Sequence, residues 1–296
     1  MVEGDTAVKQ ILRPFFILLI MASLVVAGCG NSAEQGSADA ENPEEKKELG
    51  LSDVLSEAEK ALQEEKGFSY AASGTQTMSM DLGGQKQDIE QTFNVDMDMT
   101  TDPLAMQMKG SMQMMGQEIP MEMYMVDNMI YQKTPTGAWT KGQLEGLDMS
   151  QMGGQTQTPN QVLEQLQKFL EKFQGDQQNE NIKMSKEDGA YVIEVAVTED
   201  VDAEYMKQLE DALRSTMVPQ IEQSGLPINK DDVDVKVNEF TQKVWIDENN
   251  FQQKKVEQSM KAAINLGEIQ MDVVQDMTMD LKGKFEGTIT VPEEAK

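Results

Sequence analysis

The chain has 296 residues, with 52 acidic against 25 basic side chains, a net charge of −27, no histidine, one cysteine and 24 methionines. Nucleic acid and anionic membrane surfaces would repel so acidic a protein, so we expect neither as an electrostatic partner. Histidine-based triads, histidine-ligated zinc, internal disulfides and cysteine-rich metal clusters are excluded. No carboxylate pair stands out for acid–base chemistry, so we expect no enzyme and no cofactor.

The N-terminal segment is typical of a secretory signal peptide. Lys9 and Arg13 precede an apolar run over residues 14–27, which ends in small residues. Export signals combine a basic segment, an apolar stretch of this length and small residues at the cleavage site. The run is also short for a transmembrane helix. We therefore predict a signal peptide over residues 1–28.

The single cysteine lies directly after this segment. Val26, Ala27, Gly28 and Cys29 resemble the lipobox of bacterial lipoproteins. The resemblance implies cleavage before Cys29 and attachment of a diacylglyceryl group to its sulfur. Two acyl chains anchor a protein to a membrane stably, whereas one does not. It predicts a protein held at the extracytoplasmic face of the cell membrane through S-diacylglyceryl cysteine.

The next segment, residues 29–50, is acidic and has no apolar periodicity. Such a segment cannot bury enough surface to fold, so we predict a disordered tether. From residue 51 to residue 66 the apolar residues recur at helical spacing, with Ser52 as a plausible N-cap and Gly67 as the stop. A folded domain is expected to begin with this helix and to occupy residues 51–296.

Beyond Gly67 the pattern changes to a period of two, which is typical of strands with one buried and one solvated face. Turns are predicted at Gly83-Gly84 and at Asp102-Pro103, and short strands around Ile130 and Trp139. Consecutive hairpins of this kind form an antiparallel meander. Its apolar phase is mostly methionine: Met78, Met80, Met97, Met99, Met106, Met108, Met112, Met114, Met121, Met123 and Met125.

The middle of the chain predicts two further helices and a strand pair. Thr158-Pro159 begins a helix that ends at Gly175, and Asp202 caps another that is kinked or ends near Pro219. Between them, alternation over residues 191–197 after a Glu187-Asp188-Gly189 turn predicts the strand pair.

Three final strands are predicted over residues 233–246, 251–264 and 269–291, and Met277 and Met279 lie on one phase of the last. The fold class we expect is α+β, a wide antiparallel sheet with amphipathic helices covering its apolar face.

Three interpretations of the methionine-rich face remain open. Methionine is an adaptable apolar residue and can simply fill a core. It also suits a surface that accepts variable apolar partners, such as acyl chains, and then Trp139 and Trp245 are expected to line or border the cavity with the methionines. Thioethers are also soft ligands for Cu(I), and Met-X-Met places two sulfurs on one face of a strand.

Three segments carry a family resemblance: Ile130–Trp139, Val244–Glu248 and Ile289–Lys296. On these segments the chain from Leu51 onward resembles a group of uncharacterised Gram-positive lipoproteins, which are similar in layout to the LolA-like and LppX/LprG-like lipoprotein carriers. The resemblance implies a curved half-barrel sheet whose concave face is covered by helices and encloses an apolar cavity for lipid. It transfers no catalytic residue.

The function expected from the sequence is that of a monomeric, membrane-anchored lipoprotein that binds or carries an apolar ligand, with lipid acyl chains as the first candidate. A methionine-rich Cu(I)-binding module and a structural or sensory surface protein without a ligand are the alternatives.

Overall fold

The computed structural model describes residues 49–63, 65–82, 85–143, 163, 166–167, 181–224, 232–267 and 269–296. The predicted signal peptide, the lipobox with Cys29 and nearly all of the predicted tether lie outside these residues. So does most of the helix predicted to begin at Thr158 and to end at Gly175.

An antiparallel sheet of 11 strands dominates the described structure, in the order β6-β5-β4-β3-β2-β1-β11-β10-β9-β8-β7. Successive strands pair as hairpins, and β1 pairs with β11 to join the two halves of the sheet at its centre. The strands are β1 (Gly67–Leu82), β2 (Gln85–Thr101), β3 (Leu104–Met114), β4 (Gln117–Val126), β5 (Met129–Lys133), β6 (Trp139–Gln143), β7 (Ile182–Glu187), β8 (Ala190–Val197), β9 (Val233–Asp247), β10 (Gln253–Leu266) and β11 (Ile269–Lys284).

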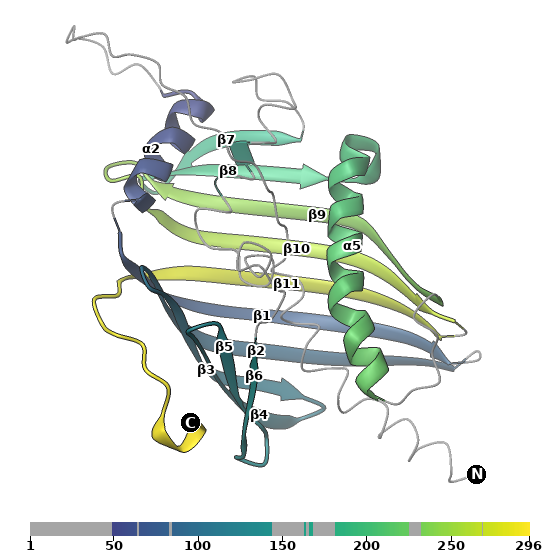
Figure 1. Cartoon of the computed structure of the whole chain (residues 1–296). Helices are drawn as coiled ribbons and strands as arrows, with labels where there is room; N and C mark the ends of the chain where they lie inside the picture. The colour runs from purple at the N-terminus through teal and green to yellow at the C-terminus, as the bar shows by residue number, and fades with distance from the viewer. Residues whose placement is uncertain are drawn as a thin grey trace, which may run out of the picture.

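The sheet is strongly curved. Figure 1 shows β3–β6 turned out of the plane of β7–β11, with α2 (Leu51–Gln63) and α5 (Glu199–Ser224) on the concave side. The predicted α+β half-barrel, with helices over its concave face, is confirmed by this arrangement.

Both described helices form where the sequence predicted them, but α2 begins at Leu51 and ends at Gln63, so Ser52 lies inside the helix and is not its N-cap. α2 buries the apolar stripe that predicted it, including Leu51, Val54 and Leu55. Asp202 has non-helical backbone angles, and its Oδ1 accepts a hydrogen bond from the Tyr205 N–H at 3.0 Å, so it caps the long part of α5 as expected. α5 does not end at Pro219 but continues to Ser224.

The last predicted strand was too long. β11 ends at Lys284, and the chain then leaves the sheet, ending in a short 3-10 helix, η2 (Glu293–Ala295). Ile289 and Val291 pack with Tyr124 in a small second core. The alternation that predicted a strand to Val291 therefore reflects a segment that buries its apolar side chains against the outer face of the sheet.

The main core lies between the inward, concave face of the sheet and the helices. It is one cluster that includes α2, α5 and the inward residues of the strands, together with Leu163 and Leu166. The outer face carries the alternate residues, which are mostly Ser, Thr, Gln, Asp, Glu and Lys. A candidate site for an apolar ligand must therefore be sought on the inward face.

Candidate functional site

The inward face of β2, β3 and β4 is rich in methionine. Because successive side chains of a strand point to opposite faces, the alternate spacing places them together on one side. We call this surface the methionine face: Met97, Met99, Met106, Met108, Met112, Met114, Met121, Met123 and Met125. On β3 each inward position from Met106 to Met114 is methionine except Gly110, whose added Cβ would lie 2.1 Å from the Asn94 backbone oxygen.

The strand register aligns these residues in rows. Met106 lies directly opposite Met99 on one side and Met125 on the other. Met108 lies in the same way between Met97 and Met123. Residues directly opposite have Cβ atoms about 4.5–5.5 Å apart, so their side chains are within reach of one another. All six are at most 8% exposed, so the two rows form one buried thioether surface.

The other methionines predicted for the site extend this surface to the centre of the sheet. Met78 and Met80 come from β1, and Met277 and Met279 from β11. They belong to the same hydrophobic cluster as the methionine face. The prediction that these methionines gather on one face of one sheet is therefore confirmed.

The two tryptophans do not join them, and this expectation was wrong. Trp245 lies between the buried residues Val244 and Ile246 on β9, so it points to the outer face, where the Lys255 Nζ lies 4.7 Å from its ring centroid. Trp139 packs in the second core, 5.9 Å from Tyr124 between ring centroids. The phase of the strand alternation places both rings on the side away from the methionines.

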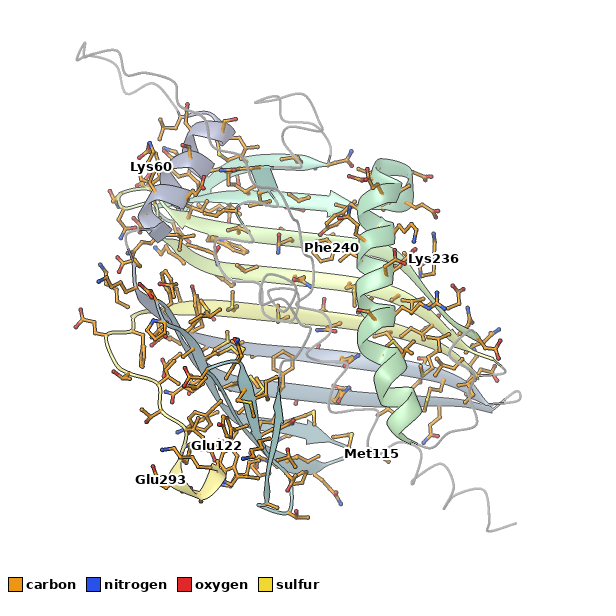
Figure 2. The ribbon with its side chains drawn as sticks, in the orientation of Figure 1. Lys60, Met115, Glu122, Lys236, Phe240 and Glu293 are labelled. Atoms are coloured by element: carbon orange, nitrogen blue, oxygen red, sulfur yellow. The ribbon has the colours of Figure 1, made fainter. Side chains whose placement is uncertain are left out.

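Charged groups cluster on the outer face. Glu122 lies between Lys133 at 3.0 Å and Lys109 at 3.8 Å, at the end of the sheet where Figure 2 also places Glu293. Burial acts to raise the pKa of Glu122, but hydrogen bonds from Lys133 and Tyr124 and the two lysine charges outweigh it, so the pKa is lowered. This ionic cluster holds β3, β4 and β5 together beside the C-terminal segment.

Sequence reasoning missed a row of buried glutamines on the inward face. Gln76 lies directly opposite Gln91 on β2 and Gln275 on β11. Gln258 on β10 lies opposite Gln242 on β9 and diagonal to Gln275. These five side chains, which we call the glutamine row, are between 0% and 6% exposed. The only signal in the sequence was a glutamine at positions where the alternation calls for an apolar residue.

Within the row, Gln76 and Gln91 form an incompletely bonded pair. The Nε2 of Gln91 donates a hydrogen bond to the Oε1 of Gln76 at 2.7 Å. The Nε2 of Gln76 and the Oε1 of Gln91 are buried and have no partner. Buried polar groups are usually satisfied, so this donor and this acceptor need an explanation.

The inward face is polar at the glutamine row but carries no net charge there. Among the described residues, the buried polar and charged side chains are the glutamine row, Gln253 and Asp202, and Asp202 caps α5. Burial also raises the pKa of the Tyr70 hydroxyl, which keeps this phenol neutral beside the methionine face. The arrangement can hold apolar groups and neutral hydrogen-bonding groups.

The outer face has a groove of a different chemistry. Its volume is about 720 Å³, and its lining includes Ser73, Thr92, Asn94, Lys243 and Asp276. Such a polar surface offers little to a hydrocarbon chain. Over the described ranges, no three His, Cys, Asp or Glu residues are grouped so as to hold a metal ion. Nor does any helix there have the length and apolarity needed to cross a membrane.

A family model described as a family of unknown function, DUF6612, matches residues 50–296 of the chain. A comparison with curated proteins finds no match. The match begins where the predicted tether ends and covers the predicted folded domain.

Three solved structures illustrate the structural comparison. A LolA superfamily protein from Nitrosomonas europaea is 9% identical, with 79% of this chain and 94% of that chain covered and a TM-score of 0.20. A DUF1329 family protein from Desulfovibrio piger is 9% identical, with 78% and 93% covered and a TM-score of 0.23. A putative outer membrane lipoprotein-sorting protein domain from Vibrio parahaemolyticus is 8% identical, with 80% and 93% covered and a TM-score of 0.19. The superfamily named by the sequence resemblance is among these, but likenesses at this level carry no argument about function.

Proposed function

The chain belongs to this family of unknown function, DUF6612, and we propose that it is a membrane-anchored extracytoplasmic lipoprotein that binds an apolar ligand on the methionine face. The first candidate for the ligand is the acyl chain of a lipid. The observation that carries the proposal is the register of β2, β3 and β4, which assembles buried methionines into one continuous surface.

Methionine suits this task because its unbranched, polarisable side chain adapts to partners of different shape. Promiscuous binding surfaces use it for that reason, whereas a rigid core is better specified by branched residues. Burial of one methylene contributes about 0.8 kcal/mol. A chain of about fifteen methylenes would therefore supply roughly 10 kcal/mol before the costs of binding, which is ample for retention during purification.

The test is mass spectrometry of the protein purified gently from its own membrane, which should reveal a co-purifying apolar molecule. Met108→Trp should reduce the amount recovered, because the large ring fills space on the methionine face. Met115→Trp is the matched control, since Met115 lies in a turn with 59% of its surface exposed (Figure 2). Repeated recovery of empty wild-type protein, or equal loading of both variants while thermal unfolding shows them folded, would contradict the proposal.

The proposed anchor has its own test. Replacing Cys29 by serine removes the thiol that the diacylglyceryl group requires, while Val26, Ala27 and Gly28 remain in place. The wild-type protein should incorporate a labelled palmitate analogue and fractionate with membranes, and Cys29→Ser should do neither. Equal labelling of the two proteins would rule out Cys29 as the lipidation site.

A second candidate function is favoured by the same register. The row Met97–Met108–Met123 places three thioethers on adjacent strands, and thioethers are ligands suited to Cu(I). A Cu(I) competition titration with wild type and with Met108→Leu distinguishes the candidates. Tight copper binding that Met108→Leu abolishes would support a metal module, whereas affinity no tighter than micromolar would dispose of it.

A further inference from the structure

The amide pair Gln76–Gln91 lies at the edge of the methionine face. Gln91 is directly opposite Met114 on β3 and opposite Gln76 on β1. Both glutamines are at most 1% exposed. A ligand that lies along the methionine face therefore meets these two amides directly beside Met114.

The pair offers one donor and one acceptor. The hydrogen bond from Gln91 to Gln76 leaves the Nε2 of Gln76 and the Oε1 of Gln91 without partners. If the nitrogen and oxygen positions of both amides are exchanged, the pair still has one donor and one acceptor without partners. Leaving buried groups unbonded costs free energy, so a molecule that supplies both missing partners gains by binding there.

The surroundings of the pair restrict the charge of that molecule. The buried polar side chains near it in the sheet are further glutamines, and Asp202, the one carboxylate buried among the described residues, serves as the cap of α5. A charged group brought to this face would lose its hydration without gaining a counter-charge. The group that fits is therefore neutral.

We propose that Gln76 and Gln91 select, among apolar ligands, those whose hydrocarbon carries a neutral group that both donates and accepts a hydrogen bond, such as a hydroxyl or an amide. This inference rests on the proposed function and names the class of its ligand. The ligand's donor bonds the Oε1 of Gln91, and its acceptor receives a hydrogen bond from the Nε2 of Gln76. Sites that hydrogen-bond a ligand reject analogues lacking the group, because the site's own polar atoms are then left unpaired.

The experiment measures displacement of a neutral apolar dye, N-phenyl-1-naphthylamine, from the wild-type protein by two matched pairs of probes. One pair is oleyl alcohol and oleyl methyl ether, and the other is oleamide and N,N-dimethyloleamide. Each pair keeps the same acyl or alkyl chain and the acceptor oxygen, and replaces the donor hydrogens by methyl groups. We expect the donor-bearing member to bind about tenfold more tightly in at least one pair, and the pair that shows the preference identifies the group.

Variants then assign the preference to the glutamines. In Gln76→Leu/Gln91→Leu the preference should disappear, with the ether and the dimethylamide bound at least as well as before. Gln253→Leu is the matched control, because it makes the same change at a buried glutamine of β10 that lies outside the glutamine row, and it should keep the preference.

Equal binding of both members of each pair to the wild type would overturn the inference while leaving the proposed function intact. Persistence of the preference in the double variant would overturn it too, since other groups would then be responsible. If the double variant does not fold, the single variants Gln76→Leu and Gln91→Leu take its place, and an undiminished preference in both would overturn the inference. Failure of the wild type to bind the dye or any probe would instead count against the proposed function itself.

Discussion

Two regions of the same inward face are built from different residues. On β2, β3 and β4 the inward side chains are largely methionine, whereas on β8 and β9 they are largely valine, isoleucine and phenylalanine: Ile193, Val195, Val197, Val233, Val235, Val237, Phe240, Val244 and Ile246. The branched region packs against α5, where Tyr205 meets Phe240 with ring centroids 5.9 Å apart. Figure 2 shows Phe240 beside that helix.

The difference shows that strands of this sheet can pack against a helix without methionines of their own. Branched residues are stiff at χ1, raise strand propensity and specify a unique packing, and the chain uses them where α5 lies. The methionine face, on β2, β3 and β4 of the same sheet, is built from side chains without that stiffness. This is the arrangement expected if β8 and β9 hold a permanent partner and β2–β4 hold one that varies.

The largest expected effect comes from truncating one buried side chain of similar size in each region. The two losses of stability should differ if the two regions differ in rigidity. Ile193→Ala should lower the free energy of unfolding by about 4 kcal/mol, because rigid neighbours leave a cavity. Met108→Ala should cost only about 2 kcal/mol, because adaptable neighbours close part of the space. Urea unfolding of the ligand-free proteins measures both. Both residues are buried, at 0% and 8% exposure, so equal losses would show that the two regions are equally rigid.

The sequence predicted the features of the site that depend on local alternation. The strands, their inward phase and the gathering of the methionines follow from a period of two along each strand. The pairing of β1 with β11 joins residues about 200 positions apart, for example Met78 with Val273, and no local pattern encodes it.

The glutamine row depends on that pairing. Gln76, Gln91 and Gln275 are unremarkable as single residues, and only the register of three strands brings them together. The tryptophans are a different case. Val244 and Ile246 occupy the apolar phase of their strand, which indicates that Trp245 points to the outer face. The expectation that large aromatic rings border an apolar cavity did not take this alternation into account.

An intermediate effect is expected when methionines of the methionine face are replaced by β-branched residues like those of β8 and β9. Met97→Ile, Met108→Ile and Met123→Ile together replace one cross-strand row by β-branched residues of similar volume. Stability should change by less than about 1.5 kcal/mol per replacement. The range of ligands should narrow, so that fatty alcohols of different chain length differ in affinity by about tenfold where the wild type binds them alike.

Displacement of the same neutral dye by an alcohol series gives this measurement. The control is Met97→Leu, Met108→Leu and Met123→Leu, which keeps unbranched Cβ positions and should preserve a broad range. If the isoleucine protein binds the series as evenly as the wild type, adaptability of methionine is not what the face provides.

The smallest expected effect concerns the turns that close a hairpin in each region. At the β9–β10 turn, the Oδ1 of Asp247 accepts hydrogen bonds from the backbone N–H groups of Asn249 at 2.8 Å and Asn250 at 3.2 Å. Lys254 adds an ion pair at 3.3 Å. The Asn249 and Asn250 hydrogen bonds and the Lys254 charge lower the pKa of Asp247 despite partial burial. The β3–β4 turn at Met115 and Gly116 instead relies on positive φ angles of 51° and 75°.

A carboxylate with a lowered pKa in the folded state stabilises that state fully above its ordinary pKa of 3.8, and the contribution is lost as the pH falls through the lower folded value. Acid should therefore loosen the β9–β10 hairpin by about 1 kcal/mol or less, since solvent screens the groups, and should leave the β3–β4 hairpin unaffected by this turn. Amide hydrogen exchange measured above and below that pH should show the difference. Asp247→Asn should remove the pH dependence from β9 and β10, because the amide oxygen still accepts the backbone hydrogen bonds but does not titrate. A pH dependence that persists in this variant would show that groups other than Asp247 are responsible.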